Sequence, residues 1–552
     1  MKKMKVIFRF IKQAWKKCIP CLILAVFIVG LQIVMPIAVR QFLSRLEESA
    51  EIKLLLIALV LYALLLGVYN VLDVIWMKSL DRMGGAILSG MRSELMRAIY
   101  YAPYKKVLAT GTEKIKNIIY MDTINIFGCI SVHTVNVITN VMLICIFEII
   151  AFNIDVMLGA ALLAVAVVGF ILALLTRGRI AGASRDVNMK MKLDNKNVSE
   201  YVDSIEAARN NNLISYFVDK ENNCIHDFIN ASVKADNTLV SLKNLVSQFH
   251  QWASLLLIAL TTMYVKGDAG NLVFAMLVLD VVLDASRSLE NSLYQIVRNE
   301  PSFEHMEELL ALTQEIKGEV LDSVDSISFE NVSFSYDDKK EVISELNAEF
   351  KKGEIIHVKG ENGKGKSTFI KLLNGLLEPD CGSIRYNDVN LSDLKPENRC
   401  ANVLYIGQDE TLLNESVEKY LDIIAAAMTI GSTDGMTNGK KTDEADSGLS
   451  DKKCIQDIIT KLGLSDIKRE IEELGMSLSG GQRRKLLLAK LMLLYENAPV
   501  IIIDEIENDL DKDTRKLWQQ FARKLYEEKD RHVIFYISHE NSEEFSTRVF
   551  EI

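Results

Sequence analysis

The sequence lacks an excess of basic residues. Its 552 residues include 63 Lys and Arg against 73 Asp and Glu, which gives a formal net charge of −10 and a pI near 5.5. Binding along a nucleic acid backbone needs a basic face, so this balance argues against nucleic acid as the main partner. The chain is also too long for a single core, and its length predicts several domains.

Clustered cysteines and a signal cleavage site are missing as well. The eight cysteines are dispersed, and only Cys18 and Cys21 are closely spaced. Because no second pair completes a zinc site, we interpret the cysteines as reduced thiols. The basic start of the chain precedes an apolar run over 19–39 that is longer than a usual signal segment and has no clear small-residue cleavage site. This run therefore predicts a retained membrane span.

Long apolar runs are confined to the first part of the chain, and six of them reach or approach the about 20 residues that a helix needs to cross a bilayer. They are residues 19–43, 54–77, 132–152, 156–176, 245–265 and 271–296. After them the composition becomes mixed and charged, as in a soluble domain. We therefore expect a transmembrane domain over 1–300, a linker over 301–326 and a soluble domain over 327–552.

The distribution of Lys and Arg predicts the orientation in the membrane. Most of them in the first part of the chain fall in two long polar segments, 78–131 and 177–244, whereas the other links between spans are short. The positive-inside rule places these segments and the N-terminus in the cytoplasm. Six crossings then return the chain to the cytoplasm. We predict a multi-pass integral membrane protein whose helices continue past the bilayer toward a cytoplasmic soluble domain.

Acidic residues near the last predicted span have two interpretations. Asp280 and Asp284 share a helix face, and Arg287 is three residues beyond Asp284. Intramembrane charges are costly and usually face a partner or an aqueous cavity. The first interpretation is an Asp284–Arg287 pair; the second, kept as a hypothesis, is that Asp280 and Asp284 line a cavity and favour cationic cargo.

A glycine-rich stretch in the soluble half has the spacing of a phosphate-binding loop. It lies between a predicted strand over 354–359 and apolar residues at helical spacing, so backbone N–H groups and the positive end of the helix dipole face an anion. Lys366 adds a charge for the β- and γ-phosphates, and the Ser367 hydroxyl is placed to ligate Mg²⁺. The predicted nucleotide-binding residues here are Gly360, Asn362, Gly363, Lys364, Gly365, Lys366, Ser367 and Thr368.

Three further features predict contacts to a nucleotide. Tyr336 precedes the loop and can stack on an adenine ring, although an ordinary strand aromatic is the alternative. Gln408 follows an apolar strand over 403–406 and offers an amide oxygen as a ligand. A second helix N-terminus with a serine hydroxyl and backbone amides is predicted at Ser479, Gly480, Gly481 and Gln482.

Two buried strands end in residues suited to hydrolysis. The apolar run over 500–503 ends at Asp504 and Glu505, and carboxylates at the carboxyl end of such a strand lie beside the phosphate loop in an open parallel sheet. Asp504 can hold Mg²⁺ through water, and Glu505 can polarise the attacking water. The strand over 533–537 leads to His539, which can contact the γ-phosphate.

Taken together, these motifs resemble the exporter-type ATP-binding cassette (ABC) half-transporters. The aromatic loop, Walker A, Q-loop, signature, Walker B, D-loop and switch histidine of that family correspond in order to Tyr336, 360–368, Gln408, 478–482, 500–505, Asp511 and His539. The resemblance spans nearly the whole chain. It implies a membrane α-helical domain of six transmembrane helices, followed by an α/β P-loop ATPase cassette.

The resemblance also implies a mechanism. Two cassettes of a homodimer or heterodimer sandwich two ATP molecules, each bound by one subunit's Walker A and the other subunit's Ser479 region. It implies ATP and Mg²⁺ as cofactors, with Lys366, Gln408, Glu505 and His539 as catalytic residues. The implied metal ligands are Ser367, Gln408 and Asp504, and Asp511 joins the nucleotide-binding residues.

The function so implied is ATP-driven transport by alternating access, exporting a peptide, a lipid or another amphipathic compound across a bacterial plasma membrane. An importer on the same scaffold, such as one for siderophores, is the first alternative. A membrane sensor that binds ATP without transport is another. One departure from the family stands out: Ile506-Glu507-Asn508-Asp509-Leu510 replaces the usual Pro-Thr-Ser-Ala-Leu and leaves Asp511 in register. Because Glu505 and His539 are both present, we expect an active cassette.

Overall fold

The chain folds into two compact units, which are described separately. The computed structural model describes residues 10, 12, 14–48, 52–264, 269–313, 318–336, 341–361, 363–407, 410–432, 448–467, 471–472, 475, 477–507, 510–538 and 545–552. The first unit comprises Met1–Tyr100 and Thr110–Thr313, and the second comprises Tyr101–Ala109 and Gln314–Ile552. A short piece of the predicted transmembrane domain thus groups with the second unit. The domain ranges drawn from the sequence stay a prediction.

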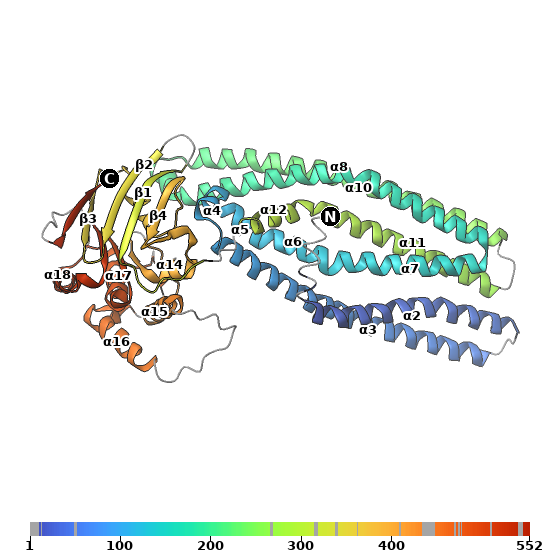
Figure 1. The fold of residues 1–552 in the computed structure, drawn as a ribbon. Helices are drawn as coiled ribbons and strands as arrows, with labels where there is room; N and C mark the ends of the chain where they lie inside the picture. Colours follow the sequence, from blue (N-terminus) through green and yellow to red (C-terminus); the bar gives the residue numbers. More distant parts are fainter. Residues whose placement is uncertain are drawn as a thin grey trace. The chain divides into compact units, whose positions relative to one another are not determined.

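The first unit is helical (Figure 1). Its long helices are α2 (Trp15–Glu48), α3 (Ile52–Tyr100), α7 (Thr134–Ile154), α8 (Val156–Asp203), α10 (Ile214–Tyr264) and α11 (Ala269–Arg298). The shorter elements are α5 (Thr112–Asn117), a π-helical turn (Ile118–Asp122), α6 (Thr123–Gly128), a second π-helical turn (Cys129–His133), α9 (Ile205–Asn210) and α12 (Glu300–Leu310). The predicted spans fall on the long helices; the third begins within the second π-helical turn, and residue 265 lies outside the described residues.

The apolar character of these helices agrees with a membrane domain. Within the described residues, three helical stretches are long and apolar enough to cross a membrane: Trp15–Leu43, Leu59–Tyr100 and Thr112–Asn153. They overlap the first three predicted spans, and the shorter apolar stretch Gly159–Leu172 lies within the fourth. The apolar crossings over 245–265 and 271–296 stay predictions.

Several helices are much longer than a bilayer is thick. Helix α8 has 48 residues and α10 has 51, and the two pack along each other (Figure 1). At 1.5 Å per residue, each helix is about 70 Å long or more, which is over twice the about 30 Å of a hydrocarbon layer. These lengths agree with helices that continue well past a bilayer, which stays a prediction.

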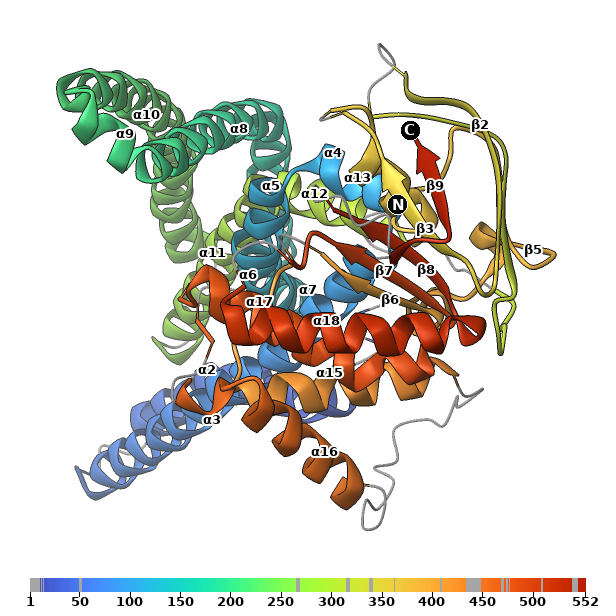
Figure 2. The same ribbon diagram turned by 90° about the vertical axis from the view of Figure 1, so that its left-hand side faces the viewer.

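The second unit contains two sheets. A five-stranded parallel sheet has the order β6-β7-β8-β3-β9, and a four-stranded antiparallel sheet has the order β2-β1-β4-β5 (Figure 2). The strands are β1 (Ser326–Ser335), β2 (Glu341–Lys351), β3 (Ile355–Lys359), β4 (Cys381–Tyr386), β5 (Val389–Asn390), β6 (Val403–Ile406), β7 (Val500–Asp504), β8 (Val533–Ile537) and β9 (Arg548–Glu551). The four predicted strands of the parallel sheet are confirmed as β3, β6, β7 and β8, whereas β9 was not predicted.

Helices of the second unit connect and cover these strands. They are α4 (Tyr104–Thr110), α13 (Lys366–Leu373), α14 (Pro396–Asn402), α15 (Val417–Ser432), α16 (Gly448–Lys461), α17 (Gly480–Leu494) and α18 (Lys512–Glu527). A flexible insertion was expected over 431–453. Helix α15 instead continues to Ser432 and α16 begins at Gly448, so both ends of this segment are helical, and residues 433–447 lie outside the described part of the chain.

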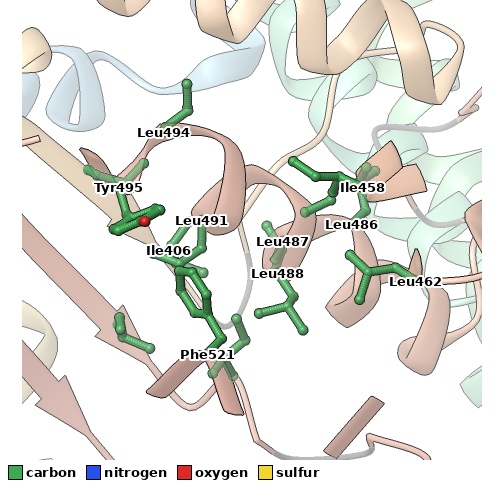
Figure 3. Packing of buried hydrophobic residues seen from close by; sticks show 14 of the residues in the cluster. Ile406, Ile458, Leu462, Leu486, Leu487, Leu488, Leu491, Leu494, Tyr495 and Phe521 are labelled. Atoms are coloured by element: carbon green, nitrogen blue, oxygen red, sulfur yellow. The ribbon is translucent and has the colours of Figure 1, made fainter. Parts of the chain in front are cut away.

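Both faces of the parallel sheet are buried, which explains the unbroken apolar run of β7. Ile501 and Ile503 pack into a core with residues of α15, α16, α17 and α18. Figure 2 shows these helices beside the sheet, and Figure 3 shows members of this core such as Leu487 and Phe521. Val500 and Ile502 face the other way, into a core shared with α13 and the antiparallel sheet. A sheet covered on two sides needs apolar residues at every position, so the alternation typical of a half-exposed strand is absent here.

Candidate functional site

The predicted phosphate loop joins β3 to α13. Gly363 and Gly365 have φ values of 85° and 110°, and Gly365 directly precedes the first residue of α13. The Lys366 ammonium folds back over the loop and donates to the Gly360 carbonyl at 2.6 Å. Ser367 is exposed at the same helix start. The loop therefore presents an ammonium, a hydroxyl and a helix N-terminus together, which is the arrangement that binds phosphate groups.

The predicted adenine-stacking residue lies beside this helix. Tyr336 is 43% exposed, and its ring packs edge-to-face on Phe334, with ring centroids 5.1 Å apart. The buried Thr368 hydroxyl of α13 donates to the Tyr336 hydroxyl at 3.3 Å. This contact and the Phe334 ring orient Tyr336, whose exposed area is available to a flat ligand.

The signature residues form the N-terminus of α17. Ser479 is the N-cap: its Oγ accepts from the Gln482 backbone N–H at 3.3 Å, and the Gln482 side-chain oxygen accepts from the Ser479 N–H at 3.0 Å. This capping box leaves the serine O–H proton free to be donated elsewhere. The helix is anchored because Leu486, Leu487 and Leu488 are fully buried (Figure 3). The turn containing Ser479 and Gly480 is exposed.

The predicted Mg²⁺ and water-activating carboxylates follow β7. Asp504 is the last residue of β7 and pairs with Ile537 of β8, so the two strands end side by side. Glu505 is the next residue, and its backbone N–H donates to the Ile537 carbonyl at 3.1 Å. Glu505 has a φ of 53°, a value that a non-glycine residue adopts only when its surroundings hold it. The turn after β7 is thus fastened to the end of β8.

Asp511 caps the next helix and joins it to the signature helix. Its Oδ1 accepts from the Thr514 backbone N–H at 2.8 Å, and its Oδ2 lies 2.7 Å from Lys485 Nζ of α17. The hydrogen bond from Lys485 and those from Thr514 hold the pKa of the Asp511 carboxyl well below its usual value. Asp511 therefore stays ionised through the physiological pH range.

Three predicted site residues, Asn362, Gln408 and His539, lie outside the described residues. The neighbourhood of the predicted Q-loop is nevertheless well defined. Glu410 accepts a charged hydrogen bond from Lys490 of α17, and Lys490 also donates to the Tyr405 carbonyl at 2.9 Å. Arg483 donates to the Glu410 carbonyl at 2.7 Å. The sequence did not predict the contacts of Lys490 with Glu410 and Tyr405, because a lysine in a helix is usually a solvent-exposed cation.

The predicted cavity residues belong to the first unit. Asp280 and Asp284 are exposed on α11, on the side opposite its buried residues Val278, Leu279 and Val282. No Asp284–Arg287 ion pair is found among the described side chains, and neither interpretation of these acids is tested. A cavity role for Asp280 and Asp284 stays a prediction.

Residues 101–109 carry contacts that the sequence did not reveal. Lys105 Nζ lies 2.8 Å from Asp380 Oδ1 and 5.1 Å from the centroid of the Phe334 ring. Asp380 Oδ2 accepts from the Ser335 backbone N–H at 2.8 Å, next to Tyr336. The segment that follows α3 is thereby joined to the strand carrying the predicted adenine-stacking residue.

The cysteines take no part in this site. All eight are free thiols, as predicted, and no group of three or more His, Cys, Asp or Glu side chains in the described residues is arranged to hold a metal ion by itself. Ser367 and Asp504 supply the hydroxyl and carboxylate oxygens that Mg²⁺ prefers, which suits an ion completed by phosphate oxygens and water.

Comparison with known proteins identifies the cassette. Residues 343–508 match the ABC transporter family. Over 259 residues the chain is 29% identical to a probable ABC transporter ATP-binding/permease protein of Haemophilus influenzae, covering 46% of this chain and 43% of that protein. It is 26% identical over 310 residues to the glutathione/L-cysteine transport system protein CydD of Bacillus subtilis, covering 53% of this chain and 51% of that protein.

Two further similarities concern a lipid transporter and the fold. Over 192 residues the chain is 30% identical to the ATP-dependent lipid A-core flippase of Coxiella burnetii, covering 35% of this chain and 30% of that protein. A bacterial Atm1-family ABC exporter with ATP bound has the same fold, with a TM-score of 0.81 and 18% identity over 97% of this chain and 93% of that one. The chain spans about half or less of the length of the curated relatives that it matches.

The fold and the motifs define a helical membrane domain followed by a P-loop ATPase cassette. The chain has the fold of an exporter-type ABC half-transporter, in which one membrane domain is fused to one nucleotide-binding domain, and its cassette matches the ABC transporter family. The predicted fold class is confirmed.

Proposed function

We propose that this protein hydrolyses Mg-ATP in its cassette and uses the energy to export an amphipathic compound, such as a lipid or a peptide, across a bacterial plasma membrane. The observation that carries the proposal is the convergence of the phosphate loop and the Glu505 turn at the carboxyl ends of β3 and β7 in one parallel sheet. Ligands of open α/β sheets bind at that edge.

The residues of this edge suit the steps of phosphoryl transfer. Lys366 and the N-terminus of α13 neutralise phosphate charge, and Ser367 and Asp504 would hold a Mg²⁺ ion, which neutralises charge on the phosphate oxygens when bound. Glu505 orients and polarises the attacking water. Gln408 and His539 are proposed to complete the site.

A dimer follows from the position of Ser479. Its exposed hydroxyl and the N-terminus of α17 offer a second anion-binding surface, which we propose contacts the ATP held by the partner subunit. ATP then favours the closed cassette pair, and hydrolysis releases it.

The Lys105–Asp380 contact couples the strand next to Tyr336 to the segment after α3, so nucleotide binding near Tyr336 can change the position of that segment. We expect the N-terminus and the cassette to lie in the cytoplasm, and either a homodimer or a heterodimer satisfies the arrangement.

The experiment uses the full-length protein in liposomes. We expect the parent protein to hydrolyse ATP and to move a fluorescent phospholipid or a labelled amphipathic peptide. Lys366→Ala should abolish ATP binding, whereas Glu505→Gln should keep binding and lower kcat by about 100-fold or more. Lys371→Ala, on the same helix beyond the loop, is the matched control.

Vesicle orientation tests the direction of transport. Accumulation of the probe inside vesicles whose cassettes face outward supports export. ATP-dependent loss of preloaded probe from those vesicles contradicts it. ATP binding without hydrolysis and without movement of either probe would instead favour the sensor function over transport.

A further inference from the structure

We propose that Glu507 is a positioning residue for ATP hydrolysis, which fastens the turn carrying Glu505 to strand β8 and helix α18. The inference rests on the ATPase function proposed above. It concerns a position at which this chain has a carboxylate in place of the family's usual threonine.

The Glu507 carboxylate is shared by two other elements. Its Oε1 accepts a hydrogen bond from the Trp518 indole N–H of α18 at 2.9 Å and another from the Tyr536 hydroxyl of β8. The Trp518 and Tyr536 rings also stack on each other, with centroids 6.4 Å apart and planes 22° apart. Glu507 therefore bonds to both members of an aromatic pair that joins α18 to β8.

The Glu507 side chain is long enough to reach both donors. Tyr536 is fully buried and Trp518 is 3% exposed, so their polar hydrogens need partners within the protein. An ionised carboxylate accepts at all its lone pairs and donates nothing, so one oxygen can serve both groups. A threonine hydroxyl would be two bonds shorter and would itself carry a proton.

The contacts matter because of what lies on either side of Glu507. Glu505, two residues earlier, has a φ of 53° and donates its backbone N–H to the Ile537 carbonyl at 3.1 Å. Asp511, four residues later, caps α18. Glu507 is thus attached in the middle of the loop that carries both motif residues, and it adds a side-chain bond to the strand that already holds the Glu505 backbone.

The same carboxylate also lies next to the residue that precedes His539 in the sequence. Ser538 Oγ is 3.5 Å from Glu507 Oε2, a long contact, and the Ser538 carbonyl is 3.4 Å from Nε2 of the buried His357 on β3. Glu507 therefore stands between the ends of β7 and β8, where the predicted water-activating and γ-phosphate-contacting residues originate. A displacement of about 1 Å at such a site can lower the rate by about 100-fold.

The experiment measures ATPase kinetics of the full-length protein in lipid. Glu507→Ala removes the acceptor, and Glu507→Gln keeps its size while placing an N–H₂ group near the donors. We expect Glu507→Ala to lower kcat by about tenfold or more with the KM for ATP within about twofold of the parent, and Glu507→Gln to have a smaller effect. Asp513→Asn, at a side chain that is 95% exposed near the start of α18, is the matched control and should leave kcat unchanged.

Removing a donor tests the same contact from the other side. Tyr536→Phe should reproduce part of the loss in kcat, and combining it with Glu507→Ala should add little, because both changes break one interaction. A readout independent of catalysis is the ¹⁹F spectrum of protein labelled with 5-fluorotryptophan. The chain has four tryptophans, so Trp518→Phe assigns the Trp518 resonance, which Glu507→Ala should shift and Asp513→Asn should not.

The outcomes separate the two proposals. If the parent hydrolyses ATP and Glu507→Ala has a kcat within twofold of it, the positioning role is wrong and the ATPase function stands. A lower melting temperature with unchanged kcat and KM of the folded protein also overturns the positioning role, since Glu507 is then only structural. A parent without ATPase activity overturns the proposed function, and the positioning role with it.

Discussion

Lys485 Nζ lies 2.7 Å from Asp511 Oδ2, so a residue of the signature helix α17 contacts the N-cap of α18. The two helices are separated in sequence by the whole of β7 and the Glu505 turn. The pair therefore connects two motifs within one subunit. In the proposed dimer, the signature motif of one subunit and the Asp511 motif of the other are expected to touch the same nucleotide.

The Asp511 contacts predict a pH dependence of stability. The folded-state pKa is lowered, so the stabilisation is fully present above the unfolded pKa of about 3.9 and is lost as the pH falls through the folded value. We expect Asp511→Ala to lower the melting temperature at pH 7, with loss of the cap costing about 1 kcal/mol. The difference from the parent should shrink below about pH 4. Lys485→Ala should cost less than Asp511→Ala, because the carboxyl of that ion pair is half-exposed. A difference that is constant from pH 7 to pH 3 would contradict the assignment.

Gly365 is predicted to tolerate no side chain. Its φ of 110° is rare for other residues, and a Cβ there would lie 3.2 Å from the Val342 carbonyl oxygen. Gly365→Ala should cost about 1–2 kcal/mol through the backbone alone and should weaken ATP binding. Gly85→Ala on helix α3, where a Cβ meets no atom within 4 Å, is the comparison and should leave ATP affinity nearly unchanged. Equal ATP affinities of the two variants, measured with a fluorescent ATP analogue, would refute the prediction.

The Glu410–Lys490 pair is predicted to be sensitive to loss of one partner. The side chains are 18% and 10% exposed, so removing one charge leaves the other buried without compensation. We expect Lys490→Met or Glu410→Gln alone to destabilise the cassette by about 3–5 kcal/mol. The double variant should recover part of this loss. Thermal unfolding of the four proteins forms a double-mutant cycle, and additive effects would show that the pair is not coupled.

Glu148 on α7 is predicted to limit the stability of the membrane domain. It is 7% exposed, and neither carboxylate oxygen has a hydrogen-bond partner among the described residues. A buried polar group without a partner is costly, so Glu148→Leu should raise the melting temperature of the protein in detergent. Asp155→Leu, at the α7–α8 connection, is the control; Asp155 accepts from the Met157 N–H at 2.8 Å, and its loss should be neutral or destabilising. A lower melting temperature for Glu148→Leu would mean that the carboxylate has a partner in the assembled protein.

Sequence reasoning predicted the elements whose signals are local. The run before Gly360, the apolar residues over 403–406 and those over 500–503 became β3, β6 and β7. Strand β9 was not predicted because its four residues Arg548–Glu551 do not form an apolar run. Its strand conformation depends on pairing with β3, which no local pattern in the sequence indicates. The helical ends of the 431–453 segment were not predicted, because its Gly-, Ser-, Asp- and Lys-rich composition is typical of a flexible loop.

What the sequence determined by itself is the order of the motifs, the apolar helices and the strand–loop–helix around Lys366, because glycine geometry, hydrophobic period and helix capping act over a few neighbouring residues. Only the tertiary structure decided that Glu507 meets Trp518 and Tyr536, that Lys490 reaches Glu410, and that Lys105 belongs with Asp380. These pairs are 11, 29, 80 and 275 residues apart. Such distances along the chain carry no local pattern, and the contacts arise only when packed elements bring buried donors and acceptors together.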